Sequence, residues 1–120
     1  MNTNESIEMY LETIHVLSKR QSVVKSIDVA NELNYARASV SKAIKIMLEK
    51  NYIKLDEKKN IILTKEGINI ANMIYDRHVT LTKLLESIGV SKATAEADAC
   101  KMEHVISDET MQAIKKHFNK

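Results

Sequence analysis

The sequence predicts a mostly α-helical protein, and three features of its composition lead to that prediction. Its 120 residues include no proline and only two glycines, and aromatic residues make up 4% of the chain. Sandwiches and barrels need many turn residues, so this composition argues against an all-β fold. Hydrophobic residues make up 44%, which is enough to form a core and excludes wholesale disorder.

Three short helices are expected at the start of the chain. Apolar residues recur there at a spacing of three to four, which is the period of an amphipathic helix. Ser26 is the predicted N-cap of the second helix. The expected helices span residues 5–19, 27–33 and 37–50, and the inward stripe of the third contains Val40, Ile44 and Leu48, with Ala43 and Met47 beside it.

A two-stranded hairpin is expected next. Tyr52, Ile53 and Leu55 form one strand and residues 61–63 the other, with the charged segment DEKKN as the hairpin tip. Three helices closed by such a hairpin make a winged helix-turn-helix, whose third helix enters the major groove of DNA. This order of elements predicts a DNA-binding domain over residues 1–70.

The rest of the chain is expected to be helical. Thr64 is the predicted cap of a long helix over residues 65–88, and Gly89 ends it. Ser91 and Ser107 are the predicted caps of two further helices, the first of which runs to about residue 106. The long helix has an inward stripe made of Ala71, Ile74, His78, Leu81, Leu85 and Ile88.

Charge is distributed unevenly along a nearly neutral chain. The formal net charge is +2, but residues 35–59 hold seven basic and three acidic residues, a local patch that suits a polyanion. No apolar run approaches the ~18 residues of a membrane-spanning helix, and the N-terminus has no signal-peptide pattern. The single cysteine, Cys100, fits a reducing compartment, so we expect a cytoplasmic protein.

The third helix and the hairpin tip contain the candidate DNA contacts. Lys and Arg neutralise phosphates, and serine hydroxyls are short enough to reach phosphates or base edges. The alternative is that this helix is core on one side and merely solvated on the other. The expected contacts are Arg37, Ser39, Ser41, Lys42, Lys45, Lys58 and Lys59.

A candidate metal site lies in the helix that is expected to end near residue 106. Cys100, Glu103 and His104 stand at positions i, i+3 and i+4, which places a thiolate, a carboxylate and an imidazole on one helical face. Each also has an ordinary interpretation, as a buried cysteine, a surface glutamate and a helix-end histidine. Cys100 and His104 have no evident orienting group or oxyanion donors, so we do not expect an enzyme.

Four segments match a known family in order along essentially the whole chain: SIEMYLETIHVL, SVSKAIKIML, YDRHVTLTKLL and DACKMEHVISDE. Through them the chain resembles the diphtheria-toxin-repressor family of iron- or manganese-dependent transcriptional repressors. The resemblance implies a homodimer that binds a palindromic double-stranded DNA operator. It also implies that residues 71–120 form a helical dimerisation and metal-binding domain, with no membrane or small organic substrate as a partner.

The resemblance also implies a set of metal ligands. Iron-responsive members bind their regulatory metal with a methionine, a cysteine, a glutamate and a histidine, and manganese-responsive members use an additional carboxylate. The matching residues are Met9, Cys100, Glu103 and His104 for the regulatory site, His78 for a second site, and Glu12 for the additional carboxylate. Because sulfur ligands are soft, this set favours Fe(II), with Mn(II), Co(II), Ni(II) and Zn(II) as alternatives. A metal held by Met9 and the other three ligands would bridge the two domains and favour operator binding.

Two departures from the family pattern concern the second site. Thr82 and Glu96 stand where iron-responsive members have a glutamate and a histidine, although Glu96 could still donate an oxygen. Longer relatives continue into an SH3-like domain that lends ligands, whereas this chain stops at Lys120, so we expect a short form with an incomplete second site. His78 could then be an ordinary core histidine. The alternative function is a winged-helix regulator without metal control, which responds to a partner protein or to oxidation of Cys100.

Overall fold

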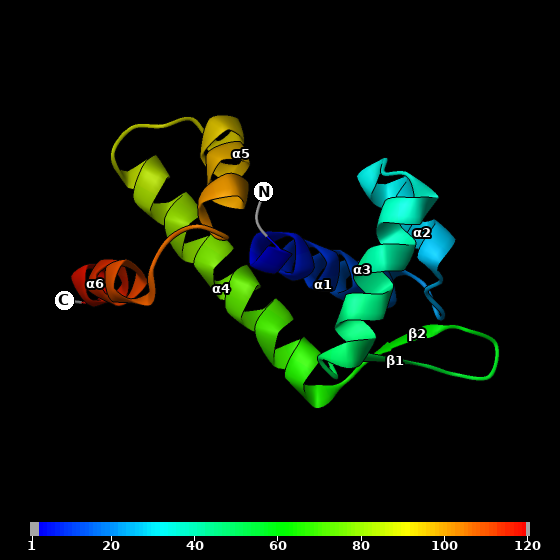
Figure 1. The fold of residues 1–120 in the computed structure, drawn as a ribbon. Coiled ribbons are helices and arrows are strands. Elements are labelled where there is room, and N and C mark those ends of the chain that lie inside the picture. The colour runs from blue at the N-terminus through cyan, green and yellow to red at the C-terminus, as the bar shows by residue number, and fades with distance from the viewer. Residues whose placement is uncertain (1–2, 120) are drawn as a thin grey trace. The chain divides into compact units, whose positions relative to one another are not determined.

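A computed structural model describes residues 3–119, and within them the chain forms six helices and one two-stranded sheet (Figure 1). The predicted fold class, a winged helix-turn-helix followed by further helices, is confirmed. The chain divides into two compact units, Met1–Asn72 and Met73–Lys120, which we call the first and second units. The elements are α1 (Thr3–Arg20), α2 (Ser26–Leu33), α3 (Arg37–Glu49), β1 (Ile53–Leu55), β2 (Ile61–Leu63), α4 (Lys65–Ser87), α5 (Lys92–Met102) and α6 (Asp108–Phe118).

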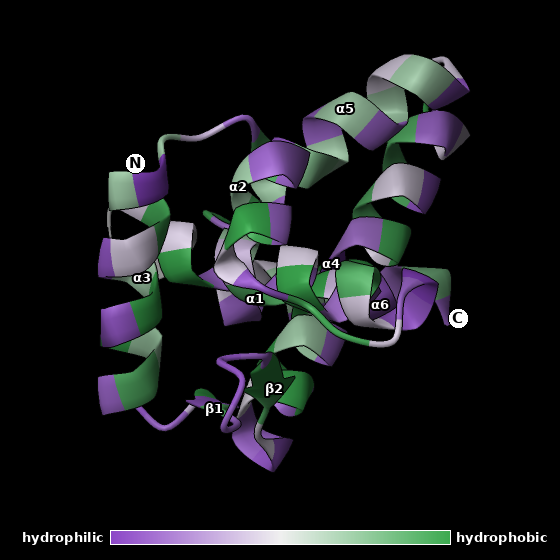
Figure 2. Ribbon diagram, turned by 90° about the vertical axis from the view of Figure 1, so that its right-hand side faces the viewer, coloured by the Kyte–Doolittle hydropathy of each residue, from purple (hydrophilic) through white to green (hydrophobic). Residues whose placement is uncertain are grey.

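The first unit has a core built by the predicted periodicity of α1. Ile7, Tyr10, Leu11, Ile14 and Leu17 are all buried there, against apolar residues of α2, α3 and the hairpin. The hydropathy colouring shows apolar residues of α3 on the side toward α1 and hydrophilic ones on the opposite edge (Figure 2). These helices therefore form because each buries one apolar stripe in a shared core.

Two local predictions for α2 and α3 are wrong. The N-cap of α2 is Lys25, whose backbone N–H donates to the Asp28 carboxylate at 2.8 Å, so Ser26 is the first helical residue. The Asp28 carboxylate thus supplies a hydrogen-bond acceptor to the backbone at the helix start. Leu48 is 39% exposed, because the buried row of α3 runs through Val40, Ala43 and Met47 instead.

The hairpin and the start of α4 close the first unit. β1 and β2 pair antiparallel with Ile53 opposite Leu63 and Leu55 opposite Ile61. The Thr64 hydroxyl accepts the N–H of Gly67 at 3.1 Å, as a cap should, and donates to backbone carbonyls just before β1. At Gly67 a Cβ would overlap the carbonyl oxygen of Tyr52, so only glycine fits there.

The second unit packs α5 and α6 against the rest of α4, and its buried apolar cluster contains Leu81, Ala99 and Met111. Ser91 and Ser107 cap α5 and α6 as predicted. Gly89 has a φ of 102° and follows the end of α4, also as predicted. Ile88, however, lies beyond α4 and is 69% exposed, so it is not part of the inward stripe.

The end of α5 differs from the prediction. The helix stops at Met102, four residues before the expected end, and Glu103 to Val105 form a turn. Glu103 keeps right-handed dihedrals, φ −61° and ψ −22°, as the C-cap residue. His104 therefore lies in a turn and not on the helical face that the spacing predicted.

Among the described residues, no helix is both long enough and apolar enough to cross a membrane.

Candidate metal centre and DNA-binding surface

A carboxylate flanked by two imidazoles lies at the end of α5 in the second unit. The Nδ1 atom of His78 is 3.0 Å from Oε2 of Glu103, and the Nε2 atom of His104 is 3.4 Å from Oε1 of the same carboxylate. The Glu103 side chain is fully buried, and that of His104 is 5% exposed. The structure therefore brings three of the predicted ligands, His78, Glu103 and His104, together.

The position of this cluster follows from the two helices that meet there. His78 lies on the inward stripe of α4, between the buried residues Ile74 and Leu81. Ala95 and Ala99 bury the matching face of α5, and Glu103 comes one turn later on that same face. Because alanine is small, α5 can approach α4 closely enough for Glu103 to reach His78.

The chemistry of this cluster fits a divalent cation. A buried carboxylate is costly unless a positive charge or hydrogen bonds compensate it. Imidazole nitrogens and carboxylate oxygens are ordinary ligands of Fe(II), Mn(II) and Zn(II). His78 and His104 each place a ring nitrogen beside a different oxygen of Glu103, so imidazole and carboxylate groups meet at this buried position.

The other predicted ligands of the second unit have different surroundings. Cys100 is exposed, and so is Glu96 one turn before it on α5. The Thr82 hydroxyl donates to the backbone carbonyl of His78 at 2.8 Å, which is a bond within α4. Thr82 thus has a structural role, in keeping with its departure from the family's second-site pattern.

Met9 and Glu12 lie on α1 in the first unit, and both are half-buried. The Tyr35 hydroxyl lies 3.7 Å from the Met9 sulfur and donates to it. Tyr35 also stacks edge-to-face on Tyr10, with ring centroids 6.0 Å apart. No sequence motif marked the contact of Tyr35 with a candidate metal ligand.

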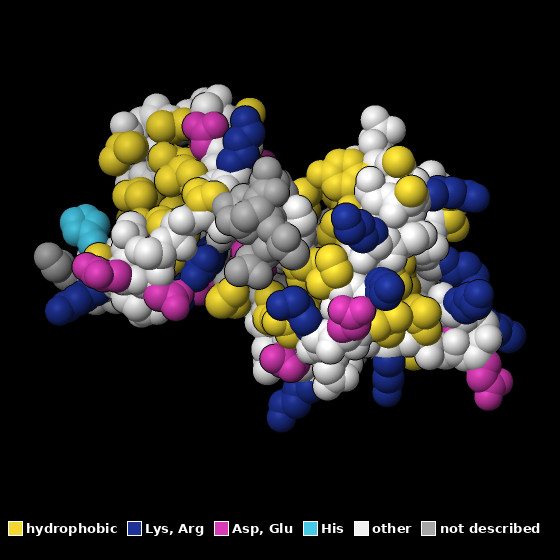
Figure 3. Space-filling model, in the orientation of Figure 1, with side chains coloured by type: hydrophobic (Ala, Val, Ile, Leu, Met, Phe, Trp, Pro, Cys, Tyr) yellow, Lys and Arg dark blue, Asp and Glu magenta, His cyan; other side chains and the backbone are white. Residues whose placement is uncertain are grey.

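The solvent side of α3 carries the candidate DNA contacts. Arg37, Ser39, Ser41, Lys42 and Lys45 are all exposed on this helix, whose buried residues are Val40, Ala43 and Met47. Lys and Arg side chains are spread over the face of the first unit that is visible in Figure 3. This arrangement can place cations along a phosphate backbone.

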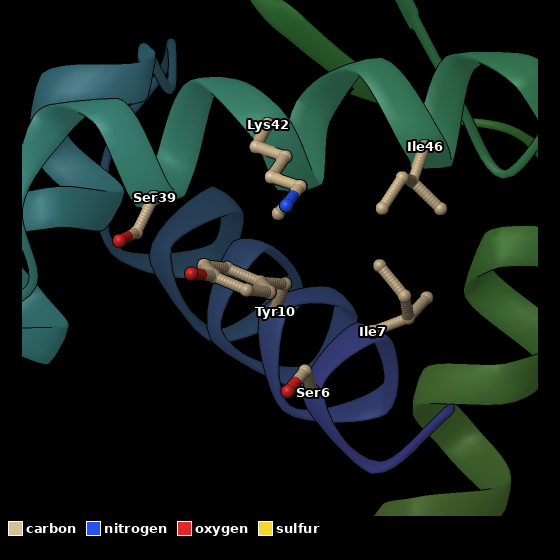
Figure 4. Close-up of a pocket in the computed structure, with 7 residues that line it drawn as sticks. Ser6, Ile7, Tyr10, Ser39, Lys42 and Ile46 are labelled. Atoms are coloured by element: carbon tan, nitrogen blue, oxygen red, sulfur yellow. The ribbon is translucent and has the colours of Figure 1, made fainter. Parts of the chain in front are cut away.

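A hollow of about 220 Å³ separates the start of α1 from α3. Ser39 and Lys42 line it from α3, and Ser6 and Tyr10 line it from α1 (Figure 4). Burial and the neighbouring Tyr35 raise the pKa of the Tyr10 phenol, so its hydroxyl stays protonated. Neither Ser6 nor Tyr10 is among the residues that the sequence predicted for a site.

The Asp56 side chain makes several of the hydrogen bonds that hold the hairpin tip. The Asp56 carboxylate accepts the backbone N–H groups of Lys58 and Asn60 at 2.9 and 2.8 Å. These bonds, mainly the one from Asn60, hold the pKa of Asp56 below its usual value. Lys58 and Lys59, both exposed, are thereby presented at the end of the hairpin.

Comparison with known families gives two matches that together span nearly the whole chain. Residues 2–61 match the N-terminal DNA-binding domain of iron-dependent repressors. Residues 64–120 match the metal-binding and dimerisation domain of iron-dependent repressors.

Similar proteins include regulators from archaea and bacteria. The chain is 34% identical over 114 residues to an uncharacterized HTH-type transcriptional regulator of Methanocaldococcus jannaschii, covering 93% of this chain and 91% of that one. It is 31% identical to the transcriptional regulator MntR of Escherichia coli O157:H7, covering 92% and 72%. It is 28% identical to the diphtheria toxin repressor of Corynebacterium glutamicum, covering 88% and 46%.

Solved structures share the fold. The manganese regulator SloR superposes with a TM-score of 0.80 at 25% identity, and the metal-dependent transcriptional regulator MtsR with a TM-score of 0.84 at 23% identity. Each match covers 99% of this chain and 55% of the other, so the chain spans about half the length of those two proteins.

Proposed function

This chain belongs to the family of iron-dependent repressors, and we propose that it is a homodimeric repressor that binds a palindromic double-stranded DNA operator when it holds a divalent metal. The observation that carries the proposal is the buried Glu103 carboxylate between the imidazoles of His78 and His104. It lies within the segment that matches the family's metal-binding and dimerisation domain. Members of the family regulate transcription and are not enzymes. Because a repressor acts where the DNA is, we propose that the protein acts in the cytoplasm.

The proposed ligands come from both units. Glu103 and His104 in the second unit, with Cys100 one turn earlier on α5, would hold the ion together with Met9 of α1. His78, Glu96 and Glu12 are further candidate donors. The presence of a thioether and a thiol among oxygen and nitrogen donors favours Fe(II) over Mn(II), and Co(II), Ni(II) and Zn(II) are chemically acceptable substitutes.

When bound, a divalent metal would supply a Lewis-acidic centre, and the residues proposed to hold it belong to both units. Met9 belongs to the same first unit as α3, whereas Glu103 and His104 belong to the dimerisation segment. Ligands shared in this way would restrict how the two units move relative to each other. In a symmetric dimer this restriction would hold the two α3 helices about one helical turn of DNA apart, on the order of 34 Å.

On the DNA side, α3 would lie in the major groove with Arg37, Ser39, Ser41, Lys42 and Lys45 facing the duplex. Lys58 and Lys59 would contact the flanking backbone from the hairpin tip. Two observations support this assignment. All seven residues are exposed, and they belong to a unit that has its own buried apolar core.

The site is tested by titrating the protein with Co(II) and recording its absorption spectrum. A site that includes Cys100 gives a thiolate-to-cobalt charge-transfer band, and the Cys100→Ser variant should lose this band. His117→Gln is the matched control, because His117 is an exposed histidine of α6 outside the cluster. Full-strength Co(II) binding without any sulfur band would show that Cys100 is not a ligand.

A further inference from the structure

Arg77 contacts the turn that carries two of the proposed metal ligands. Its Nη1 atom donates to the backbone carbonyls of Glu103 at 3.1 Å and of Ile106 at 3.3 Å. Its Nη2 atom donates to the Asp108 carboxylate at 2.6 Å. One guanidinium thus joins α4, the turn after α5 and the first turn of α6.

The surroundings of Arg77 make these bonds strong. Its side chain is only 11% exposed, so water has little access to the guanidinium, although the Asp108 carboxylate is itself exposed. The planar guanidinium can satisfy several acceptors at once, which a lysine ammonium cannot do with the same geometry. Carbonyls at and after a helix C-terminus have no partner within the helix, so Arg77 supplies what the backbone of this turn lacks.

Arg77 and its neighbour His78 approach the same residue from two sides. His78 contacts the Glu103 carboxylate, and Arg77 contacts the Glu103 backbone carbonyl. The backbone position of Glu103 determines where its carboxylate lies, and the turn that begins there also positions His104. Loss of the Arg77 bonds would therefore free both ligands together.

We propose that Arg77 is a positioning residue of the metal site, which fixes the 103–106 turn so that Glu103 and His104 present their donor atoms before an ion arrives. Asp108 orients the guanidinium. This inference rests on the proposed metal site. It also gives Asp108, which lies in the first turn of α6, a role in orienting the Arg77 guanidinium.

The first test uses the metal-free protein and measures amide hydrogen exchange. The N–H groups of Val105 and Ile106 both donate to the Met102 carbonyl, at 3.1 and 3.0 Å, so they report whether the turn is formed. In Arg77→Gln these two amides should exchange at least ten times faster, with little change in the core of α4. The matched control is Asp76→Asn, which removes an ion pair between α4 and Lys115 of α6 without touching the turn.

The second test measures Co(II) affinity and the cobalt spectrum of the same variants. Loss of a group that orients metal ligands typically weakens metal binding 10- to 100-fold, and we expect this range for Arg77→Gln and a smaller loss for Arg77→Lys and Asp108→Asn. Asp76→Asn should bind Co(II) as the unchanged protein does.

Unchanged exchange and unchanged Co(II) affinity in Arg77→Gln would overturn the inference while leaving the proposed function intact. A uniform increase of exchange throughout the second unit would also overturn it, because Arg77 would then be a general stabilising residue. Failure of the unchanged protein to bind Co(II) would instead refute the proposed metal site itself, and the inference with it.

Discussion

Lys42 and Lys45 are exposed on α3, and their position predicts that they act through phosphates. Replacing either with alanine should weaken binding to operator and random DNA alike, and each should lower the slope of log affinity against log salt by about one. Fluorescence anisotropy at several salt concentrations measures both quantities. A loss confined to the operator sequence would mean that the lysine reads a base.

His15 makes the stability of the first unit depend on pH. Burial lowers the pKa of His15 below its ordinary 6.5, and the positive charge of Lys19 lowers this pKa further. A hydrogen bond to Asn72 raises the pKa but only partly offsets these effects. The unfolded chain therefore takes up a proton first, so the stabilising contribution of neutral His15 is complete above pH 6.5 and is lost as the pH falls through the folded pKa.

We expect His15→Gln to flatten the decline in the free energy of unfolding that occurs as the pH falls below 6.5. Urea denaturation of the metal-free protein at several pH values measures this decline. His117→Gln, at an exposed position, should keep the decline of the unchanged protein. An identical decline in His15→Gln would rule out His15 as its source.

At the scale of single elements, the junction of the hairpin and α4 depends on one glycine. Alanine normally stabilises a helix by about 1 kcal/mol relative to glycine. At Gly67 the added Cβ would overlap the Tyr52 carbonyl oxygen, so the sign should reverse. Overpacking of this kind costs about 1–3 kcal/mol.

Urea denaturation of Gly67→Ala should therefore show a lower free energy of unfolding than that of the unchanged protein. Asn69→Ala is the control in the same helix, because Asn69 is exposed and its replacement should change stability by less than about 0.5 kcal/mol. A Gly67→Ala protein more stable than the original would contradict the close packing between α4 and Tyr52.

Most elements could be predicted because their signals are local. Apolar periodicity located α1 and α3, the serines at 91 and 107 marked the starts of α5 and α6, and the charged DEKKN segment marked the hairpin tip. The end of α5 could not be predicted, since the segment KMEHVIS contains neither glycine nor proline. Besides the local backbone bonds to the Met102 carbonyl, this turn is held by Arg77, which lies 26 residues earlier in the chain than Glu103.

The candidate site was predictable in part for the same reason. Spacing along one helix picked out Glu103 and His104, and the apolar stripe of α4 included His78. That His78 lies 3.0 Å from Glu103 depends on how α4 and α5 pack, which periodicity alone does not specify. The contact of Tyr35 with Met9 likewise joins residues 26 positions apart and has no sequence signature.

At the scale of the whole molecule, the proposal requires that Met9 couples the metal to DNA binding. Met9→Leu keeps a side chain of similar volume but removes the sulfur. We expect this variant to keep measurable Co(II) binding and dimerisation, because Glu103, His104 and Cys100 remain. It should lose most of the metal-induced gain in operator affinity, which for typical coupling is about 5- to 150-fold.

The control for this variant is Met47→Leu, which removes a sulfur from a fully buried core position in the same unit. It should retain the metal-induced gain. If Met9→Leu keeps the full gain as well, Met9 is an ordinary packing residue and the link between the two units lies elsewhere.

The most direct test of the proposed function is the affinity of the unchanged protein for DNA with and without metal. A duplex selected by the protein from a random pool in the presence of Fe(II) serves as the operator, at one fixed salt concentration. We expect tight binding with Fe(II) under anaerobic conditions and with Co(II), and binding at least about fivefold weaker when a chelator removes the metal. Equal affinity in chelator and in every metal would contradict metal control and would favour a winged-helix regulator that responds to another signal.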